Sequence, residues 1–174
     1  TTAFIEEEFP DGFDGVDLPE DTLTTIGAAA VAMYRVCEIR RAQISGRMDN
    51  HERKVGQDWV VTLGDTALNA HVDADKQGAT VAINGTDYRV ESAWTPGQPL
   101  AKLAVNGATF VMKVAQISAG FQVRYRGANM AVRVRTPRQA QLAKLMPVKL
   151  PADTSKMLLC PMPGLIVKLD VQVG

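Results

Sequence analysis

The stretch LTTIGAAAVAMY, residues 23–34, contains no charged residue and is rich in glycine and alanine. A helix formed by these residues has no polar face, which is typical of a helix surrounded by protein on every side. Its small residues, Gly27 foremost, keep it thin, so that neighbouring backbone can approach it closely. The sequence therefore predicts a slender buried helix that some other element of the chain must surround.

The residues on either side predict where this helix begins and ends. Asp17 can cap its N-terminus, with proline and glutamate in the first turn. Arg40 and Arg41 favour the negative end of the helix dipole, and Gly46 supplies a stop. We expect the helix over residues 17–44.

Eight short segments after the helix alternate polar and apolar residues, which predicts β-strands. Asn84-Gly85 and Asn106-Gly107 are typical of type I′ hairpin turns, and Ala119-Gly120 and Gly127-Ala128-Asn129 supply the later ones. Strands that are neighbours in sequence should therefore pair antiparallel. The expected strands are residues 58–63, 67–73, 79–83, 86–94, 100–105, 108–117, 121–126 and 130–135.

Eight antiparallel strands without a second helical layer close into a barrel or split into a sandwich. An eight-stranded barrel normally has room only for side chains, but a glycine- and alanine-rich helix is thin enough to fit. We therefore predict a mainly β (α+β) fold, in which an eight-stranded antiparallel β-barrel surrounds one long N-terminal helix. A short helix is expected over residues 138–146.

The composition, 46% hydrophobic and 22% charged, is that of a globular protein and excludes disordered and collagen-like classes. Nineteen basic residues balance nineteen acidic ones, but unevenly: residues 1–21 hold eight acidic and no basic residues, and residues 92–152 hold nine basic and no acidic residues. Either these regions face each other within the fold, or the basic region meets an acidic partner or a phosphate-bearing ligand.

Four arginines, Arg124, Arg126, Arg133 and Arg135, are expected as a cationic ladder on one face of two adjacent strands. A nucleic-acid-binding face would need aromatic side chains between them, and Tyr125 should point to the opposite face. We therefore expect no nucleic-acid partner. The longest uncharged run before the strands is too short to span a bilayer, so no membrane helix is expected either.

The sequence contains no arrangement typical of a catalytic, cofactor-binding or metal site. His51 and His71 are isolated, and no phosphate-binding glycine motif is present. Cys37 and Cys160 are far apart in sequence and are interpreted as buried thiols in a reducing compartment. We therefore expect no catalytic residue in this segment.

Residues 46–57 form a charged stretch bounded by glycine, which is long for a connector within a compact domain. Long ordered loops often carry function, and the alternative is a solvated loop with none.

The segment near the C-terminal end, MLLCPMPGLIVKLDVQVG, resembles the opening of a biotinyl carrier domain, in which a PMPG turn begins a flattened barrel. Any hairpin could use such a turn, but the preceding linker and the following strand-like run favour the carrier interpretation. In that family biotin is attached to a lysine in an Ala-Met-Lys-Met hairpin, a motif in which neither Lys156 nor Lys168 stands. The turn residues are Pro161, Met162, Pro163 and Gly164.

Residues 153–156 leading into this turn resemble the α subunits of propionyl-CoA carboxylases, and the resemblance extends over essentially the whole chain. It implies a helix-in-barrel biotin-transfer domain over residues 1–146, a linker over 147–156 and a truncated carrier domain over 157–174. Both ends of the chain are expected to continue in a longer protein. α subunits for 3-methylcrotonyl-CoA or geranyl-CoA, and a stand-alone lipocalin-like barrel that binds a small molecule, remain alternatives.

The resemblance also implies a role without chemistry of its own. The parent enzyme would use ATP, Mg²⁺ and covalent biotin, all bound outside this segment, in bacterial cytoplasm or the mitochondrial matrix. The segment would join the biotin carboxylase domain of its own polypeptide to the carboxyltransferase β subunit of a hetero-oligomer. In this family the loop after the helix is a hook onto that subunit. The hook candidates are Arg47, Met48, Asp49, Asn50, His51, Glu52, Arg53 and Lys54.

Overall fold

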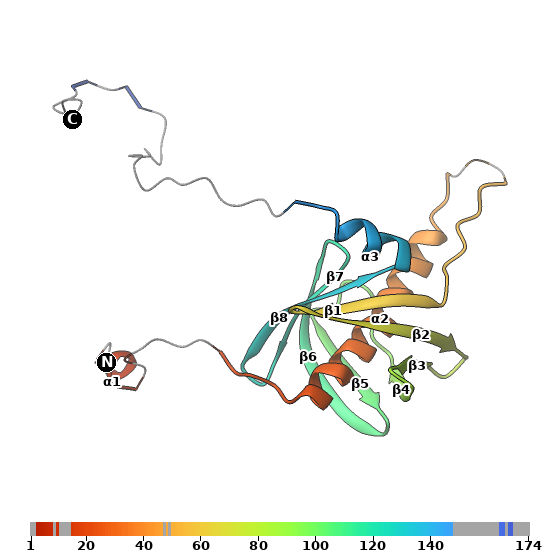
Figure 1. Ribbon diagram of the computed structural model, residues 1–174, viewed down its shortest axis with the longest axis horizontal. Coiled ribbons are helices and arrows are strands. Elements are labelled where there is room, and N and C mark those ends of the chain that lie inside the picture. Colours follow the sequence, from red (N-terminus) through yellow and green to blue (C-terminus); the bar gives the residue numbers. More distant parts are fainter. Residues whose placement is uncertain are drawn as a thin grey trace. The chain divides into compact units, whose positions relative to one another are not determined.

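The computed structural model describes residues 3–8, 10, 15–46, 48, 50–147, 164–165 and 167–168. The chain divides into two compact units, Thr1–Lys144 and Leu145–Gly174. All the helices and strands of the described residues lie in the first unit (Figure 1). Most of the expected linker and carrier segment lies outside the described residues, Pro161, Met162 and Pro163 included, and Gly164 is exposed and irregular. Those two predictions therefore remain predictions.

Eight strands form one closed barrel in which each strand is antiparallel to the next, and the last pairs with the first. This confirms the predicted fold. The strand bounds differ from the expected ones by at most two residues. They are β1 (Asp58–Leu63), β2 (Thr66–Ala74), β3 (Ala79–Ile83), β4 (Thr86–Ser92), β5 (Leu100–Val105), β6 (Ala108–Ile117), β7 (Gly120–Tyr125) and β8 (Ala128–Arg135).

The long helix α2 (Glu20–Ala42) runs through the barrel (Figure 1) and contacts β1 to β5, β7 and β8. Ala28, Ala30 and Val31 are completely buried. A Cβ at Gly27 would lie 3.3 Å from the Leu63 side chain, so this glycine lets β1 approach the helix closely. The lipocalin-like alternative is wrong, because the helix occupies the interior that such a barrel leaves open.

The ends of α2 differ from the expected ones. The cap residue is Pro19, which makes no side-chain capping hydrogen bond, and its carbonyl accepts from the Leu23 amide at 3.0 Å. Asp17 is exposed and lies two residues before the cap, so the expected aspartate cap is wrong. The helix also ends at Ala42, before the expected stop at Gly46. Capping motifs are short and occur in turns as well, so this pattern misplaced the start.

The hairpin turns confirm the two Asn-Gly predictions. Asn84 and Asn106 have φ values of 52° and 49°, as a type I′ turn requires. The β7–β8 turn instead uses Arg126-Gly127, with φ values of 47° and 88°. The turn therefore begins one residue earlier than expected.

Arg124 and Arg133 are both exposed on one face of the adjacent strands β7 and β8, as expected, but they do not stand side by side. In the antiparallel register Arg124 lies opposite Asn129, whereas Arg133 lies opposite Gly120, so four residue positions separate them along β7. Arg126 belongs to the turn and its guanidinium lies 5.2 Å from the centre of the Tyr125 ring. The register, which the alternation alone does not determine, separates these charges.

The C-terminal helix of the first unit, α3 (Pro137–Ala143), is shorter than expected and contacts β1 and β8. Thr136 and Gln139 form a capping box at its start: the Gln139 amide donates to the threonine hydroxyl, and the Thr136 amide donates to the Gln139 side chain.

The two ends of the barrel differ in their turns and in the part of α2 that lies there. Because all strands are antiparallel, the β1–β2, β3–β4, β5–β6 and β7–β8 turns share one end, where α2 enters and Gly27 packs near Leu63. The other end is called the exit end here. There Arg40 of α2 donates to the carbonyl of Pro96, in the β4–β5 connection, at 3.4 Å.

The buried helix predicts a strong difference between two substitutions. Ala29 is 1% exposed, so Ala29→Trp should lower the free energy of unfolding by roughly 1–3 kcal/mol or more, because overpacking a filled core strains it. Val36→Trp on the exposed side of the same helix is the control and should change it little. Chemical denaturation of both variants tests this, and equal stabilities would contradict a helix packed inside.

Candidate functional site

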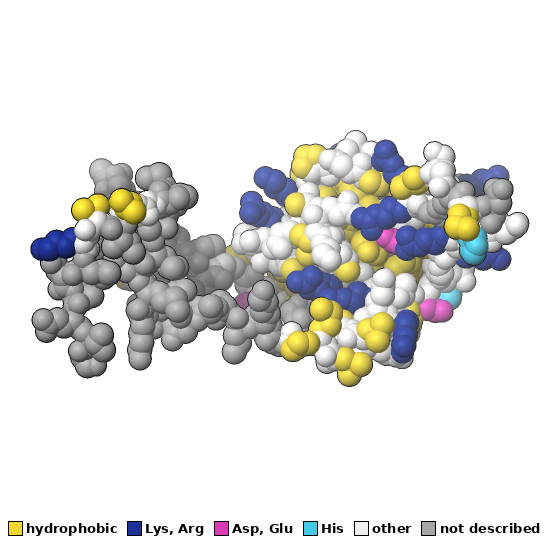
Figure 2. All heavy atoms as spheres, turned by 90° about the horizontal axis from the view of Figure 1, so that it is seen from above, with side chains coloured by type: hydrophobic (Ala, Val, Ile, Leu, Met, Phe, Trp, Pro, Cys, Tyr) yellow, Lys and Arg dark blue, Asp and Glu magenta, His cyan; other side chains and the backbone are white. Residues whose placement is uncertain are grey.

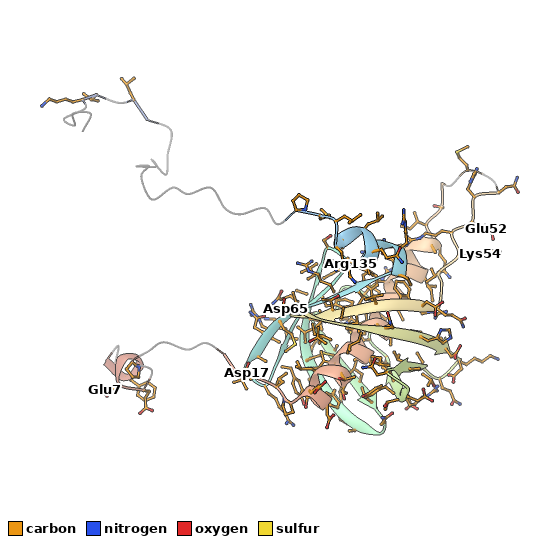
Figure 3. The ribbon with its side chains drawn as sticks, in the orientation of Figure 1. Glu7, Asp17, Glu52, Lys54, Asp65 and Arg135 are labelled. Carbon is orange, nitrogen blue, oxygen red and sulfur yellow. The ribbon has the colours of Figure 1, made fainter. Side chains whose placement is uncertain are left out.

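The chain leaves α2 at the exit end and reaches β1 through residues 46–57, called the α2–β1 loop below. Glu52 and Lys54 lie on the part of the loop that returns to β1 (Figure 3). Arg47 and Asp49 lie outside the described residues. The other six hook candidates are all exposed: Met48, Asn50, His51, Glu52, Arg53 and Lys54.

A buried carboxylate ties this loop to the helix. Glu38 is only 4% exposed and accepts a hydrogen bond from Arg41, one turn further along α2, at 2.5 Å. Arg53 of the α2–β1 loop donates to the other carboxylate oxygen. Burying a charged carboxylate is costly unless it is paired, so Glu38 requires these arginines. Arg53 is therefore a structural tether, whereas its exposed neighbours are available for other contacts.

The loop is fastened a second time where it joins the barrel. The Gln57 carbonyl accepts from the Val72 amide at 2.9 Å, and the Gln57 side chain donates to Asp73 at 3.0 Å. Two residues later, Trp59 packs edge to face on Tyr34 of α2, with 5.8 Å between ring centres. The part of the loop that returns to β1 is therefore held twice, by α2 through Arg53 and by β2 through Gln57.

The outer part of the loop turns back on itself. The His51 amide donates to the Met48 carbonyl at 3.3 Å, and Asn50 has a φ of 66°. Asparagine adopts this left-handed conformation more readily than most residues. The turn presents Met48, which is 77% exposed, beside polar neighbours. A protruding turn with an exposed methionine is suited to contact with another macromolecule.

A hollow of about 420 Å³ lies between the loop and the C-terminal half of α2. It is called the exit hollow below. Its lining combines apolar stems with basic and amide groups: Arg35, Ile39, Ala42, Gln43, Met48, His51, Glu52, Arg53 and Val55. On the face shown in Figure 2, Lys and Arg side chains are much more numerous than Asp and Glu side chains.

The described part of the chain brings together no metal-binding set. It contains no group of three or more His, Cys, Asp or Glu side chains that could hold a metal ion. Cys37 is buried as expected, and burial raises the pKa of its thiol, which keeps it protonated and unreactive. Cys160 lies outside the described residues. No helix in the described ranges is long and apolar enough to cross a membrane.

Sequence reasoning missed Glu38, the residue that positions the loop. A signal was present, because Ala30, Tyr34 and Glu38 recur every four residues along one buried stripe of the helix. A lone acidic residue on such a stripe needs a basic partner. The spacing does not identify Arg53 as that partner, since the loop brings it back only in three dimensions.

Loss of the tether should loosen the loop without unfolding the barrel. In Arg53→Met, the Glu38 carboxylate keeps its ion pair with Arg41, so the melting temperature should fall only slightly. Backbone amides 50–57 should exchange hydrogen faster than in the native chain, because the loop has lost its ion pair with the helix. Lys54→Met removes a neighbouring exposed charge and serves as the control. Equal exchange rates in the two variants would show that Arg53 does not hold the loop.

The β1–β2 pair carries a pH-dependent contact. His71 lies 2.7 Å from Asp58 and 3.7 Å from Asp73, and mainly the hydrogen bond to Asp58 raises the pKa of His71 above its ordinary value. Because the His71 pKa is raised in the folded state, the contact contributes its full stabilisation of the protein below the ordinary histidine pKa of about 6.5. That stabilisation is lost as the pH rises through the pKa of His71 in the folded state.

Asp58→Asn should therefore destabilise the protein more at about pH 5.5 than at about pH 8.5, on either side of the ordinary histidine pKa. It should also lower the His71 pKa measured by NMR titration. Asp73→Asn, which removes the more distant carboxylate, is the control and should lower that pKa less. A His71 pKa unchanged in Asp58→Asn would contradict the assignment.

Residues 26–149 match the family described as the propionyl-coenzyme A carboxylase BT domain. The chain is 62% identical over 175 residues to the propionyl-CoA carboxylase alpha chain of Ruegeria pomeroyi, and 28% and 26% identical to the mitochondrial alpha chains of Mus musculus and Homo sapiens. These alignments cover all of this chain but only 26%, 25% and 25% of those proteins, so it spans about a quarter of their length. Since the family match includes most of α2, the loop, all eight strands and α3, the chain belongs to the propionyl-coenzyme A carboxylase BT domain family.

Proposed function

We propose that this chain is the non-catalytic middle of a biotin-dependent propionyl-CoA carboxylase α subunit. The α2–β1 loop binds the carboxyltransferase β subunit, and the barrel joins that subunit to the biotin carboxylase domain of the same polypeptide. The segment after the barrel leads into the biotin carrier domain. The parent enzyme carboxylates propionyl-CoA with ATP and bicarbonate, in bacterial cytoplasm or, in eukaryotes, the mitochondrial matrix.

One observation carries the proposal: the α2–β1 loop is both exposed and held in place. Its Met48, His51, Glu52 and Lys54 side chains are exposed, while Arg53 fastens it to the buried Glu38. A loop held in one conformation loses less conformational entropy when it binds a partner. This arrangement suits a docking element better than a solvated connector.

The cofactors of the parent enzyme belong to other parts of it in this proposal. The described residues provide no carboxylate and histidine cluster that fits Mg²⁺, and the sequence has no phosphate-binding glycine motif for ATP. Neither Lys156 nor Lys168 stands between the methionines of a biotin attachment site. We therefore propose that the biotinylated lysine lies beyond residue 174.

The physical benefit of such a domain is proximity. A tethered biotin visits two active centres efficiently only if both centres belong to one assembly, where the linker sets a high effective concentration. A rigid barrel with a filled interior is suited to hold two catalytic domains within that reach.

The test compares two loop variants of the full-length α chain mixed with its β subunit. Replacing residues 51–54 with Gly-Ser should reduce the light-scattering mass of the complex. Changing only His51, Glu52 and Lys54 to serine keeps the Arg53 tether and should still weaken association, because these side chains make the contact. An unchanged mass of the complex with both variants would contradict the proposal.

Asp65→Ser serves as the matched control and should leave the mass unchanged. Asp65 is exposed in the β1–β2 turn, at the end of the barrel where α2 enters. Avidin binding and intact mass of the native parent polypeptide test the carrier assignment separately. A parent chain without biotin would contradict it.

A further inference from the structure

One arginine at the exit end has a buried side-chain nitrogen that finds no partner in the part of the chain that the structure describes. The Arg35 Nε atom is buried and has no hydrogen-bond partner among the described residues. A buried donor without a partner costs free energy, so native structures seldom leave one unsatisfied without a reason. Trp59 Nε1 is the other such side-chain atom in the described ranges, and it lies on β1 beside Tyr34, the helix residue preceding Arg35.

Arg35 faces the exit hollow. Arg35, Ile39 and Ala42 recur at intervals of four and three residues along α2, so they form one stripe of the helix that borders the hollow. The α2–β1 loop forms the opposite wall with Met48, His51 and other side chains. A partner that contacts the loop therefore reaches Arg35 through the same opening.

The charges around the hollow favour an anionic occupant. The buried carboxylate of Glu38 on the same helix is already paired with Arg41 and Arg53, and the acidic residue in the lining is Glu52, on the exposed loop. The Arg35 side chain borders the hollow, and its Nε has no hydrogen-bond partner among the described residues. A planar guanidinium matches a carboxylate with two parallel hydrogen bonds. The apolar stems beside it would cover the methylene groups of an aspartate or glutamate.

We propose that the exit hollow is the socket for an acidic side chain of the carboxyltransferase β subunit, whose carboxylate pairs with Arg35. This inference rests on the proposed function and names the chemistry of the partner surface: an aspartate or glutamate flanked by apolar residues. Arg35 is then a specificity-determining residue of the interface. In this interface the loop makes the outer contacts, and Arg35 makes the contact inside the exit hollow.

The test measures association of the full-length α chain with its β subunit at two salt concentrations. Arg35→Met keeps the length of the stem but removes the charge, and should weaken the affinity at least about tenfold at low salt, because the partner carboxylate loses its counter-ion. Arg35→Lys keeps the charge without the bidentate fork, and should fall between Arg35→Met and the native chain.

Arg124→Met on the outer face of β7 makes the same change in net charge and is the matched control; its affinity should stay within about twofold of native. Melting temperatures of all variants separate loss of binding from loss of folding. If Arg35→Met does not fold, Arg35→Lys decides, and a native affinity for it overturns the bidentate pairing.

The outcomes distinguish this inference from the proposed function. If the loop replacement abolishes association but Arg35→Met binds as tightly as native, the loop docks and the socket is wrong. If Arg35→Met and Arg124→Met weaken binding equally, the effect is one of overall charge and the socket is also wrong. If neither the loop nor Arg35 affects association, both proposals fail.

Discussion

The architecture depends on how closely the barrel wall can approach the axis of α2. At Gly27 the side chains of Val61 and Leu63 occupy the space where a larger residue would stand, and the neighbouring alanines are completely or almost completely buried. An eight-stranded barrel has little interior volume, so the helix must be thin for the strands to close around it. The closed barrel, its two distinct ends and the position of the loop all follow from this fit.

Most of the fold was predictable because its signals are local. Alternation along each strand and the Asn-Gly turns at residues 84–85 and 106–107 depend on neighbouring residues alone, and they located eight strands. The uncharged helix then selected a barrel. The expected start of the helix was wrong because a capping pattern is too short to be unique. The shared face of Arg124 and Arg133 was predicted correctly but their spacing was not, because strand register depends on long-range pairing such as that of Arg124 with Asn129.

The site was predictable only in outline. The length and charge of residues 46–57 marked the loop, but which of its side chains hold it and which are free depends on Glu38, a residue of the helix. Likewise, nothing in the sequence distinguishes Arg35 from Arg40 and Arg41. Arg35 nevertheless has a buried Nε with no partner among the described residues, whereas Arg40 reaches the Pro96 carbonyl. Such differences arise from packing, which a single sequence does not display.

Threading a helix through a closed barrel also constrains the order of assembly. β1 pairs with β8, for example at Val60 and Arg135, so the wall closes only after the ribosome has made the last strand. α2 is synthesised first and cannot bury its apolar circumference until then. Nascent chains that stop short of β8 therefore leave the apolar surface of α2 exposed, and folding of the domain is delayed until its last strand is available.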